Sequence, residues 1–588
     1  MKQLLMGNEA IALGAVRAGV SVVTGYPGTP SSEILETVAK RCREVYAEWS
    51  VNEKSALETA AGAAMSGARV MVTMKQVGLN VASDPLMSLN YTGIVGGMVI
   101  VAADDPGPVS SQTEQDTRRF GKFAKLAVFD PSSPEEAYLM IADAFDLSEK
   151  IKRPVLFRPT TRVCHGYASV ELLPPLDVKR DTRFQRNSRF VIFPKLAYES
   201  HVVIEKTLKE LSTADYPRNT LEGAGTLGIA TGGVSHAYVS EALGGQLNCK
   251  LLKVSAYPFP VGVAERFLEG LTDVLVIEEL DPVIEEELLL LSAEKKINVN
   301  IHGKRSGEVK NAGEFAPSEI AVIVNKFLGK DTAEATAQAP SNLPIRPPVL
   351  CAGCPHRGSF LAVKEACKGI NAVFCGDIGC YTLGNAKPLD MVDTCLCMGA
   401  GITMAAGIKR ADESKTTFAF VGDSTFFHTG ISGIINAVYN NADEIIVILD
   451  NSATAMTGGQ PHPGLGLVAN GSPTAKISIE NIVQAIGVQH IVKANAFDLD
   501  EAVSAVKSVL DKQGVRVIIF SGECIAVSKR RGKCVIDNDK CVNCGLCVTK
   551  LGCPALTLSG KTPTLDETLC NGCGLCAYVC GKGAIACE

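Results

Sequence analysis

Eight cysteines close to the C-terminus have a spacing that suits iron–sulfur chemistry. They form two runs with two residues between neighbouring cysteines, and one further cysteine follows each run: Cys541, Cys544, Cys547 and Cys553, then Cys570, Cys573, Cys576 and Cys580. In the two-cluster pattern of small iron–sulfur proteins, the last cysteine of each run binds the other cluster. The spacing therefore predicts two 4Fe–4S clusters, one held by Cys541, Cys544, Cys547 and Cys580 and the other by Cys570, Cys573, Cys576 and Cys553.

Two features of these runs depart from the common pattern. Five residues precede Cys553 where three are usual, and Gly581 follows the second run where a proline is usual. We therefore expect the first cluster to have an unusual potential or stability. A pair of zinc sites is the alternative, but zinc binds two pairs of ligands rather than two triplets at this spacing.

A second set of polar residues, Gly422-Asp423-Ser424 and Asn451, follows two apolar segments further upstream. The carboxyl ends of neighbouring parallel strands meet at the ligand-binding edge of an open α/β sheet. An aspartate and an asparagine at that edge can hold an octahedral Mg²⁺, whose remaining ligands would be diphosphate oxygens, water and a backbone carbonyl, here that of Ala453. Gly458 lies in a turn, Thr457-Gly458-Gly459-Gln460, that allows the backbone to approach a ligand closely.

The arrangement of these residues resembles the thiamine-diphosphate motif, in which Gly-Asp-Gly is followed by an asparagine one helix and one strand later. Asp423 and Asn451 are 28 positions apart, and Ser424 replaces the second glycine. Taken alone, the Gly-Asp-Ser triplet could also be an ordinary turn between a strand and a helix. The spaced asparagine favours the cofactor site.

Thiamine chemistry also requires a carboxylic acid beside the aminopyrimidine ring, because the proton that it shares with N1′ creates the imino group that removes the C2 proton. Glu53 is the candidate, and it precedes a segment of small residues: Ala56, Ala60, Ala61, Gly62, Ala63, Ala64, Gly67 and Ala68. Such a helix allows close approach, and it resembles the glutamate-bearing helix of thiamine enzymes. Glu58 is the rival, although we expect it to be a solvated carboxylate on the opposite face of the helix.

Alternating strands and helices must position these residues. The 588 residues exceed the ~250–300 at which a single core stops growing, so several domains are expected. Apolar, β-rich segments predict strands in three regions: Ser21–Thr24, Val70–Lys75 and Met98–Ala103 in residues 1–195; Leu227–Ala230, Leu251–Val254 and Val274–Ile277 in residues 196–330; and Phe418–Val421, Ile445–Leu449 and Val515–Phe520 in residues 349–530. Each region predicts a parallel α/β sandwich. The four prolines of residues 331–348 predict a linker, and residues 534–588 form a Cys-rich tail that metal would stabilise.

Composition and charge exclude several classes of protein. The net charge of −6 without a basic block argues against nucleic acid as a partner, and the short run Lys529–Lys533 is expected to be a solvated linker. No charged segment followed by an apolar core opens the chain, and no apolar run reaches 18 residues, so we expect a cytoplasmic protein without a membrane partner. In that reducing compartment the 21 cysteines indicate metal or redox chemistry rather than structural disulfides.

The loop Gly25-Tyr26-Pro27-Gly28-Thr29-Pro30-Ser31-Ser32-Glu33 points to a known family. It is similar to the Tyr-Pro-x-Thr-Pro-Ser-Ser loop of thiamine-diphosphate-dependent 2-oxoacid:ferredoxin oxidoreductases. With Glu53, Gly422-Asp423 and the tail, the resemblance covers nearly the whole chain. The order of domains, the segment Cys351-Ala352-Gly353-Cys354-Pro355-His356-Arg357 and the spacing before Cys553-Pro554 resemble the large subunits of the indolepyruvate:ferredoxin members.

The resemblance implies an α/β fold class, with several parallel-sheet sandwich domains of the thiamine-enzyme type and a ferredoxin-like α+β module. It assigns a pyrimidine-binding domain to residues 1–195, a transketolase C-terminal-like domain to residues 196–330, a diphosphate- and Mg²⁺-binding domain to residues 349–530 and the two-cluster module to residues 534–588. Thr29 would contact the substrate carboxylate. The alternative is that its hydroxyl caps the helix beginning near Ser31.

The resemblance also implies a third 4Fe–4S cluster beside thiamine diphosphate, held by Cys351, Cys354, Cys380 and Cys524. The alternative is that these four are free buried thiols, since cysteine is common in protein cores. Cys395 and Cys397 are expected to be free thiols only.

The implied reaction is the oxidative decarboxylation of a 2-oxoacid, an aryl pyruvate such as indolepyruvate, to an acyl-CoA, CO₂ and reduced ferredoxin. No CoA motif is visible in the sequence, and branched-chain 2-oxoacids and pyruvate remain possible substrates. One α/β domain of the longer relatives is missing, which implies a smaller partner subunit of about 200 residues, the size of one domain, and a dimer of such heterodimers. A non-oxidative thiamine decarboxylase and a pure electron-transfer subunit stay open as rivals.

Overall fold

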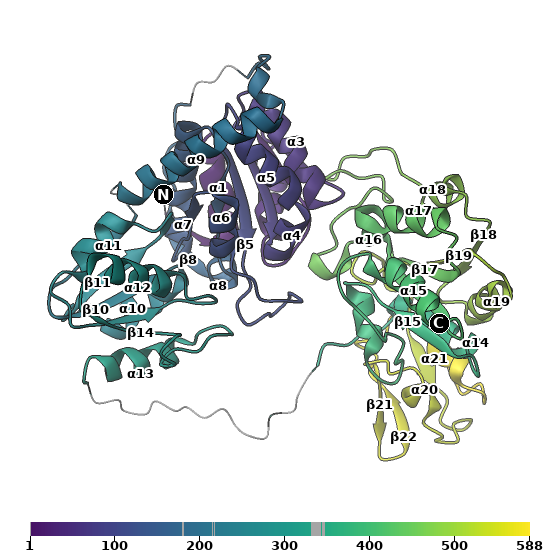
Figure 1. Cartoon of the computed structure of the whole chain (residues 1–588). Coiled ribbons are helices and arrows are strands. Elements are labelled where there is room, and N and C mark those ends of the chain that lie inside the picture. Colours follow the sequence, from purple (N-terminus) through teal and green to yellow (C-terminus); the bar gives the residue numbers. More distant parts are fainter. Residues whose placement is uncertain are drawn as a thin grey trace. The chain divides into compact units, whose positions relative to one another are not determined.

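A computed structural model describes residues 2–178, 182–214, 216, 218–330, 343 and 347–587 of the chain. The chain divides into two compact units, Met1–Ser341 and Asn342–Glu588 (Figure 1). Of the predicted linker, residues 331–342 and 344–346 lie outside the described residues. Within the described part of the chain, no helix is long and apolar enough to cross a membrane.

The first unit contains a mostly parallel sheet, in which the described residues form seven strands: in spatial order β12 (Ala256–Tyr257), β6 (Val128–Phe129), β7 (Val155–Phe157), β5 (Met98–Ala103), β4 (Val70–Lys75), β2 (Val22–Gly25) and β3 (Tyr46–Trp49). β12 alone runs antiparallel to its neighbour among these strands. Every residue of β5 is buried, as is typical of a parallel strand covered on both faces. The predicted strands at 70–75 and 98–103 are confirmed to the residue, and the strand predicted at 21–24 lies one residue later.

Helices cover this sheet because its apolar residues point to both faces. They are α1 (Gly7–Arg17), α2 (Ser32–Arg41), α3 (Glu53–Met65), α4 (Gln76–Val81), α5 (Ser83–Thr92), α6 (Thr117–Ala124), α7 (Pro134–Ile151), α8 (Thr161–His165) and α9 (Pro194–Thr213) (Figure 1). A separate antiparallel pair joins β1 (Lys2–Met6) to β8 (Tyr167–Glu171). Helix α9 packs against α5, and its first turn contains the predicted boundary at residue 195.

A second sheet in the same unit has the order β14 (Asn300–His302), β13 (Asp273–Ile277), β10 (Leu227–Gly232), β11 (Lys250–Val254) and β9 (Thr220–Glu222). Its helices are α10 (Val234–Leu243), α11 (Val261–Leu268), α12 (Val283–Lys295) and α13 (Pro317–Phe327). The strands predicted between residues 227 and 277 are all present. The two sheets are tied together, because β12 follows β11 in sequence but completes the first sheet, and one apolar core includes residues of both regions.

The second unit is built on a parallel sheet with the order β15 (Ala372–Cys375), β16 (Thr416–Gly422), β17 (Glu444–Asp450), β19 (Val515–Ser521) and β18 (His490–Asn495). Helices α14 (Pro355–Ala366), α15 (Ala400–Ala411), α16 (Asp423–Thr425), α17 (Ile431–Tyr439), α18 (Ile479–Ile486) and α19 (Leu499–Leu510) surround it (Figure 1). The three strands predicted in this region are confirmed. The fold class is therefore α/β, as the sequence predicted.

The C-terminal tail consists of short elements: β20 (Cys534–Ile536), α20 (Leu546–Thr549), β21 (Leu556–Ser559), β22 (Thr562–Leu565), α21 (Leu575–Val579) and β23 (Ile585–Cys587). β20 pairs with β23, and β21 pairs with β22. Apolar residues of the tail, among them Leu556 and Leu575, belong to the same buried cluster as Phe360 and Phe420 of the α/β domain. The tail is thus held by apolar packing on its neighbour, and the clusters predicted from its cysteines would add to this.

Candidate functional site

The structure brings Asp423 and Asn451 together at one edge of the second unit's sheet. β16 and β17 are parallel neighbours with Gly422 opposite Leu449, so both strands end at the same edge. The Asp423 carboxylate accepts hydrogen bonds from the backbone N–H of Asn451 at 3.1 Å and of Ser424 at 2.8 Å. Both predicted side chains are buried, with 1% of Asp423 and 3% of Asn451 exposed, so a charged ligand there would meet few competing waters.

Gly422 is required by the packing of Tyr381 against the turn. A Cβ atom added to Gly422 would lie 2.0 Å from the Tyr381 hydroxyl oxygen, which is far inside van der Waals contact. The same hydroxyl is 3.2 Å from the Thr425 side-chain oxygen. The glycine of the Gly-Asp pair therefore lets an aromatic ring support the turn that presents Asp423.

Two further carboxylates lie close to this edge, and sequence reasoning missed both. Asp377 accepts the N–H groups of Gly399 at 2.9 Å and Gly422 at 3.3 Å, and burial raises its pKa to about 6. Asp450 lies beside Asp423, and burial followed by the charge of Asp423 raises the pKa of Asp450. Like charges held together out of water favour a bound cation, and oxygen ligands of this kind suit Mg²⁺.

Ala453 and Gly458 lie in the loop that follows β17, and Ser424 lies in α16 within hydrogen-bond distance of that loop. Ala453 is buried, and its N–H donates to the Asn451 side-chain oxygen at 3.2 Å. The Ser424 hydroxyl accepts a hydrogen bond from Thr454 at 2.9 Å. Gly458 has a φ of 126°, a conformation that favours glycine, so this predicted turn does need its glycine.

Two buried histidines complete the surroundings of Asp423 and Asn451. His462 Nε2 donates to the Asp423 carboxylate at 3.1 Å, and the Asn451 amide donates to His356 Nε2 at 3.1 Å. Burial lowers the pKa of His356 to about 4 against the opposing effect of Asp423, so its imidazole is neutral at physiological pH. His356 was visible in sequence only as part of the Cys-Pro-His-Arg segment, and its partner Asn451 is 95 positions away.

Glu53 begins helix α3 in the first unit and is 5% exposed. Asn52 caps the helix by accepting the N–H of Ser55 at 2.8 Å. Gly78 of α4 lies against the carboxyl group, because an added Cβ would be 2.6 Å from Glu53 Oε1. Glu58 is exposed and forms an ion pair with Lys54, so its predicted role as a solvated carboxylate is confirmed. Of the two, Glu53 is the carboxyl group held in a protein environment.

The loop that carries Thr29 lies beside a lysine that sequence reasoning missed. Lys75 ends β4, packs its side chain against Gly28, and donates to the Ser110 carbonyl at 3.0 Å. The Ser110 hydroxyl in turn donates to the Thr29 carbonyl at 3.2 Å. Burial lowers the pKa of Lys75, while Asp105 and Glu53 oppose that shift. A lysine at the end of a mostly apolar strand was the available signal.

The alternative role for Thr29 as a helix cap is wrong. Helix α2 begins at Ser32 with Ser31 as its N-cap. The Gly28 N–H donates to the Ser32 hydroxyl at 2.9 Å, and the Ser31 hydroxyl donates to the Gly28 carbonyl at 2.9 Å. Serine side chains therefore organise this turn, and contact of Thr29 with a substrate carboxylate stays a prediction.

The four cysteines predicted to hold a third cluster lie near one another in the second unit. Cys354 interacts electrostatically with Cys380 and Cys351, and Cys524 with Cys351. Burial followed by the neighbouring thiols raises the pKa of Cys380 to about 11. One member of the set also contacts the sheet edge that carries Asp423 and Asn451, called the Asp423 edge below. The Cys524 N–H donates to the Asn451 carbonyl at 2.9 Å. Besides burial, neighbouring thiols raise the pKa of Cys354, Cys380 and Cys524, so the four thiols lie close enough to interact, and their binding of a third cluster stays a prediction.

The first predicted set in the tail surrounds a cavity of about 210 Å³, whose lining includes all four cysteines: Cys541, Cys544, Cys547 and Cys580. The remaining lining is largely apolar, with Leu546, Pro563 and Ile585 among its residues. The Ala584 N–H donates to the Cys580 sulfur at 3.3 Å. Cys580 of the second run therefore lies at the same cavity as three cysteines of the first run, and their binding of one cluster stays a prediction.

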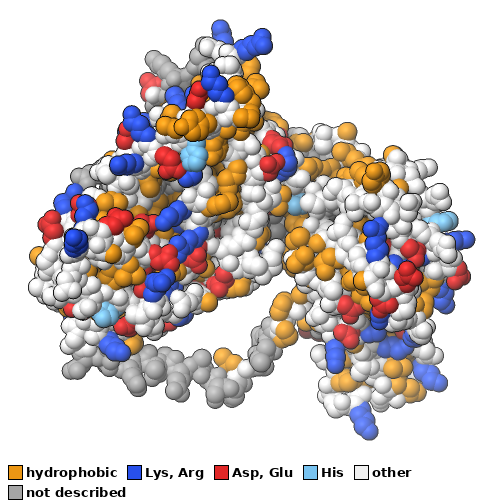
Figure 2. All heavy atoms as spheres, viewed as in Figure 1, with side chains coloured by type: hydrophobic (Ala, Val, Ile, Leu, Met, Phe, Trp, Pro, Cys, Tyr) orange, Lys and Arg blue, Asp and Glu red, His pale blue; other side chains and the backbone are white. Residues whose placement is uncertain are grey.

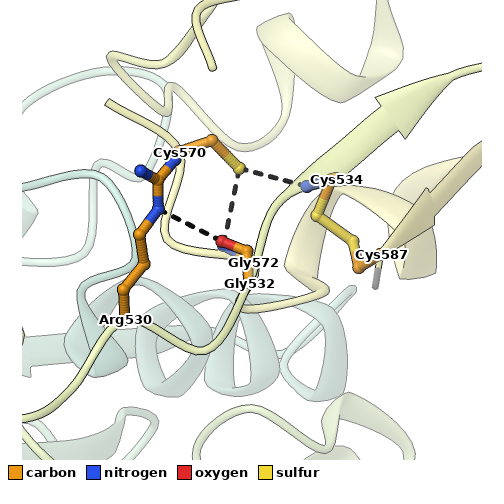
Figure 3. The surroundings of a disulfide bond; sticks show 6 residues. All are labelled: Arg530, Gly532, Cys534, Cys570, Gly572 and Cys587. Atoms are coloured by element: carbon orange, nitrogen blue, oxygen red, sulfur yellow. Dashed lines mark hydrogen bonds between the residues drawn. A yellow bond between two sulfur atoms is a disulfide. The ribbon is translucent and has the colours of Figure 1, made fainter. Parts of the chain in front are cut away.

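The cysteines of the second predicted set also lie close enough to influence one another. Cys576 interacts electrostatically with Cys573, Cys553 and Cys570. The sulfur of Cys570 accepts two backbone N–H groups, from Cys534 and Gly572, each at 3.4 Å (Figure 3). Such N–H donors stabilise a thiolate and would tune a cluster bound to it.

The expectation that cysteines of this chain form no structural disulfide is wrong for one pair. Cys534 and Cys587 are joined by a disulfide bond, drawn in Figure 3. β20 and β23 run antiparallel with these two residues directly opposite, which brings the sulfur atoms together. The bond lies against Cys576, since the three sulfurs are within 4.8 Å of one another. Pairing of distant strands is not readable from cysteine spacing.

Three segments of the chain match known families. Residues 13–207 match "Pyruvate flavodoxin/ferredoxin oxidoreductase, thiamine diP-bdg", residues 377–520 match "Thiamine pyrophosphate enzyme, C-terminal TPP binding domain", and residues 563–586 match "4Fe-4S binding domain". The two thiamine matches contain Glu53 and the Asp423 edge, respectively, and the third contains the second cysteine run. The fold and these matches define a thiamine-diphosphate-dependent oxidoreductase with an iron–sulfur domain, of the 2-oxoacid:ferredoxin oxidoreductase class.

Curated relatives narrow the family further. The chain is 40% identical over 630 residues to "Indolepyruvate oxidoreductase subunit IorA" of Pyrococcus horikoshii, covering 99% of this chain and 96% of that protein. It is 41% identical over 605 residues to the protein of the same name in Methanothermobacter thermautotrophicus, covering 100% and 97%. The chain belongs to the IorA family. A more limited likeness, 28% over 186 residues, joins 30% of the chain to 52% of "2-oxoglutarate synthase subunit KorA" of Archaeoglobus fulgidus.

Proposed function

We propose that the chain catalyses the oxidative decarboxylation of an aryl 2-oxoacid, indolepyruvate or a related aryl pyruvate. CoA and oxidised ferredoxin would be the co-substrates, and aryl-acetyl-CoA, CO₂ and reduced ferredoxin the products. The names of the relatives that match along nearly the full chain support the aryl substrate. The iron–sulfur domain supports an electron-carrying acceptor.

One observation carries the proposal of an oxidative reaction. The Cys524 N–H donates to the Asn451 carbonyl at 2.9 Å, and Cys524 also interacts electrostatically with Asp423. A four-cysteine set is therefore attached to the edge that would hold the diphosphate and its metal. A non-oxidative decarboxylase would have no use for a redox centre at this edge, and a pure electron-transfer subunit would have no use for the Asp423 edge.

In the proposed reaction, the predicted site residues would have the following roles. When bound, thiamine diphosphate would serve as the electron sink while CO₂ leaves the substrate. Asp423, the Asn451 side chain and the Ala453 carbonyl would hold the Mg²⁺ that binds the diphosphate. Glu53 would share a proton with N1′ of the aminopyrimidine. Thr29 would contact the substrate carboxylate.

Three clusters would carry the electrons onward: the two in the tail and a third one held by Cys351, Cys354, Cys380 and Cys524. Each 4Fe–4S cluster accepts one electron, so the two electrons of the reaction leave singly, and potentials of roughly −400 mV suit such clusters. The set attached to the Asp423 edge would receive them first. The tail clusters would then reduce ferredoxin.

We further propose a smaller partner subunit of about 200 residues, the size of one domain, and a dimer of such heterodimers. The relatives are named as subunits, which supports a partner. The surface also offers a candidate contact, since Phe193, Tyr198, Val202 and Val203 at and near the start of α9 are 49% to 75% exposed. Figure 2 shows hydrophobic side chains gathered over α9. Exposed apolar groups of this kind are typical of interaction surfaces.

The substrate is tested with the complex isolated anaerobically with its natural partner. Initial rates of ferredoxin reduction are measured with CoA and a panel of indolepyruvate, phenylpyruvate, a branched-chain 2-oxoacid, 2-oxoglutarate and pyruvate. We expect kcat/KM for the aryl substrates to exceed the others about tenfold or more, because pocket contacts of ring size contribute a few kcal/mol. Preference for pyruvate or a branched-chain acid would refute the aryl substrate, and CO₂ release without ferredoxin reduction would refute the oxidative reaction.

A further inference from the structure

Arg357 is a buried cation in an unfavourable place. It is 3% exposed and is the third residue of α14, whose N-terminus lies at Cys354. The N-terminal end of a helix carries a partial positive charge, so it repels a guanidinium group. Desolvation adds to this cost, and burial lowers the pKa of Arg357. Something nearby must therefore supply negative charge.

No carboxylate in the described part of the chain supplies it. Among the described residues, the guanidinium of Arg357 forms no ion pair, and Nε has no hydrogen-bond partner. Its two other nitrogens donate to backbone carbonyls: Nη1 to Leu551 at 2.7 Å and Gly552 at 2.9 Å, and Nη2 to Leu350 at 2.6 Å. By contrast, the buried Arg516 of the same unit contacts the Asp443 carboxylate at 2.7 Å.

Two of the predicted cluster sets lie next to the guanidinium instead, because its carbonyl partners Leu350 and Gly552 directly precede Cys351 and Cys553. Arg357 interacts electrostatically with Cys553 and Cys573, which belong to the second tail set. It also interacts with Cys351 and Cys354, which belong to the set at the Asp423 edge. The cation thus lies close to residues of both predicted sets. A 4Fe–4S centre with four thiolate ligands carries net negative charge, which a neutral thiol does not.

We propose that Arg357 is the shared counter-charge of these two clusters and raises the reduction potential of both. This inference rests on the proposed cluster ligands and adds a role for a residue outside them. A fixed positive charge stabilises the reduced form of a cluster, which is the more negative form, so each cluster accepts an electron more readily. Its unpartnered Nε–H is available for a cluster or cysteine sulfur. Arg357 would act on electron transfer as a positioning residue, without touching the substrate.

The hydrogen bonds from Arg357 to backbone carbonyls suggest a different, purely structural role. In that role Arg357 would dock residues 551 and 552 of the tail onto α14. The two roles predict different results for variants that keep or remove the positive charge. A lysine at this position keeps the charge but loses the planar fork of the guanidinium, whereas a glutamine keeps one amide donor and removes the charge. Docking requires the fork, and the counter-charge requires only a cation.

The test uses the whole chain with its partner, in wild type, Arg357→Lys, Arg357→Gln and the control Arg516→Gln. Iron content is measured first, and the midpoint potentials are then measured by EPR-monitored titration with a chemical reductant, so that no turnover is needed. We expect Arg357→Gln to lower the reduction equilibrium constant of one or both clusters about tenfold, which is about 59 mV for a one-electron couple. Arg357→Lys and Arg516→Gln should change these potentials by much less, and the signal of the cluster at Cys541, Cys544, Cys547 and Cys580 should not move.

Unchanged potentials in Arg357→Gln with full iron content would overturn the proposal. If that variant loses iron, Arg357→Lys decides: full iron and near wild-type potentials support the counter-charge, whereas equal loss of iron in the lysine variant refutes it in favour of docking. Failure of the proposed function looks different. It would be seen in the wild type, as missing iron or missing 2-oxoacid oxidation, before any variant is compared.

Discussion

Replacement of Glu53 by glutamine should nearly abolish turnover while leaving the fold intact. Gln has the same shape, so the close fit against Gly78, where an added Cβ would lie 2.6 Å from Oε1, is retained. What is lost is the proton that the carboxyl group would share with N1′. Positioned acid–base groups contribute about 10²- to 10⁴-fold, which is roughly 3–5 kcal/mol of barrier.

The assay is kcat for ferredoxin reduction at saturating 2-oxoacid, with thiamine and iron content measured on the same sample. Glu58→Gln is the matched control, since Glu58 lies on the same helix but is exposed beside Lys54, and we expect it to be mild. Gly78→Ala should also reduce kcat, because its new methyl group must displace the Glu53 carboxyl, and small misplacements can cost up to about 10²-fold. Turnover of Glu53→Gln within about threefold of wild type, at full cofactor content, would sink the assignment.

Three further predictions concern the second unit. Asp423→Ala should lose Mg²⁺-dependent binding of thiamine diphosphate, measured by titrating the cofactor into the variant, and unchanged affinity would refute the role of Asp423. Glu444 is buried, and burial raises its pKa to about 8 against the opposing charge of Arg516. Its contribution to stability is therefore fully present below pH 4.5, the unshifted pKa, and is lost as the pH rises through about 8. Glu444→Gln should flatten this part of the thermal stability–pH curve, and an unaltered curve would count against it. Deleting the chain from Cys534 onward should end ferredoxin reduction and lower the melting temperature, because buried side chains such as Leu575 contribute about 1.5–3 kcal/mol each. About four irons should remain in the truncated chain if the third cluster is present, and none would reject it.

Much of the fold could be predicted because its strands are continuous apolar segments. The segments at 70–75 and 98–103 match β4 and β5 to the residue, since a parallel strand buried on both faces leaves a strong local pattern. The choice of Glu53 over Glu58 and the meeting of Asp423 with Asn451 followed from the same logic. The face of a helix on which a residue lies, and the end of a strand that a residue follows, can both be predicted from nearby sequence.

Other features depend on contacts between distant segments and left no local pattern. Tyr381 fills the space beside Gly422, and Asp377 accepts the Gly422 N–H from 45 positions away. Arg357 is an ordinary arginine in sequence, and only the fold brings its guanidinium to the carbonyls of Leu350 and Gly552, beside two predicted cluster ligands. The Cys534–Cys587 disulfide likewise depends on a strand register that only the folded tail defines.

The central claim is tested most directly by stoichiometry in one anaerobic reaction. The intact complex is given indolepyruvate, CoA, thiamine diphosphate, Mg²⁺ and oxidised one-electron ferredoxin, and CO₂, acyl-CoA and reduced ferredoxin are measured together. The account predicts two reduced ferredoxins and one acyl-CoA for each CO₂, because oxidative decarboxylation releases two electrons and each cluster passes them singly. CO₂ formed without reduced ferredoxin, or no reaction with any 2-oxoacid despite bound thiamine diphosphate and iron, would contradict it.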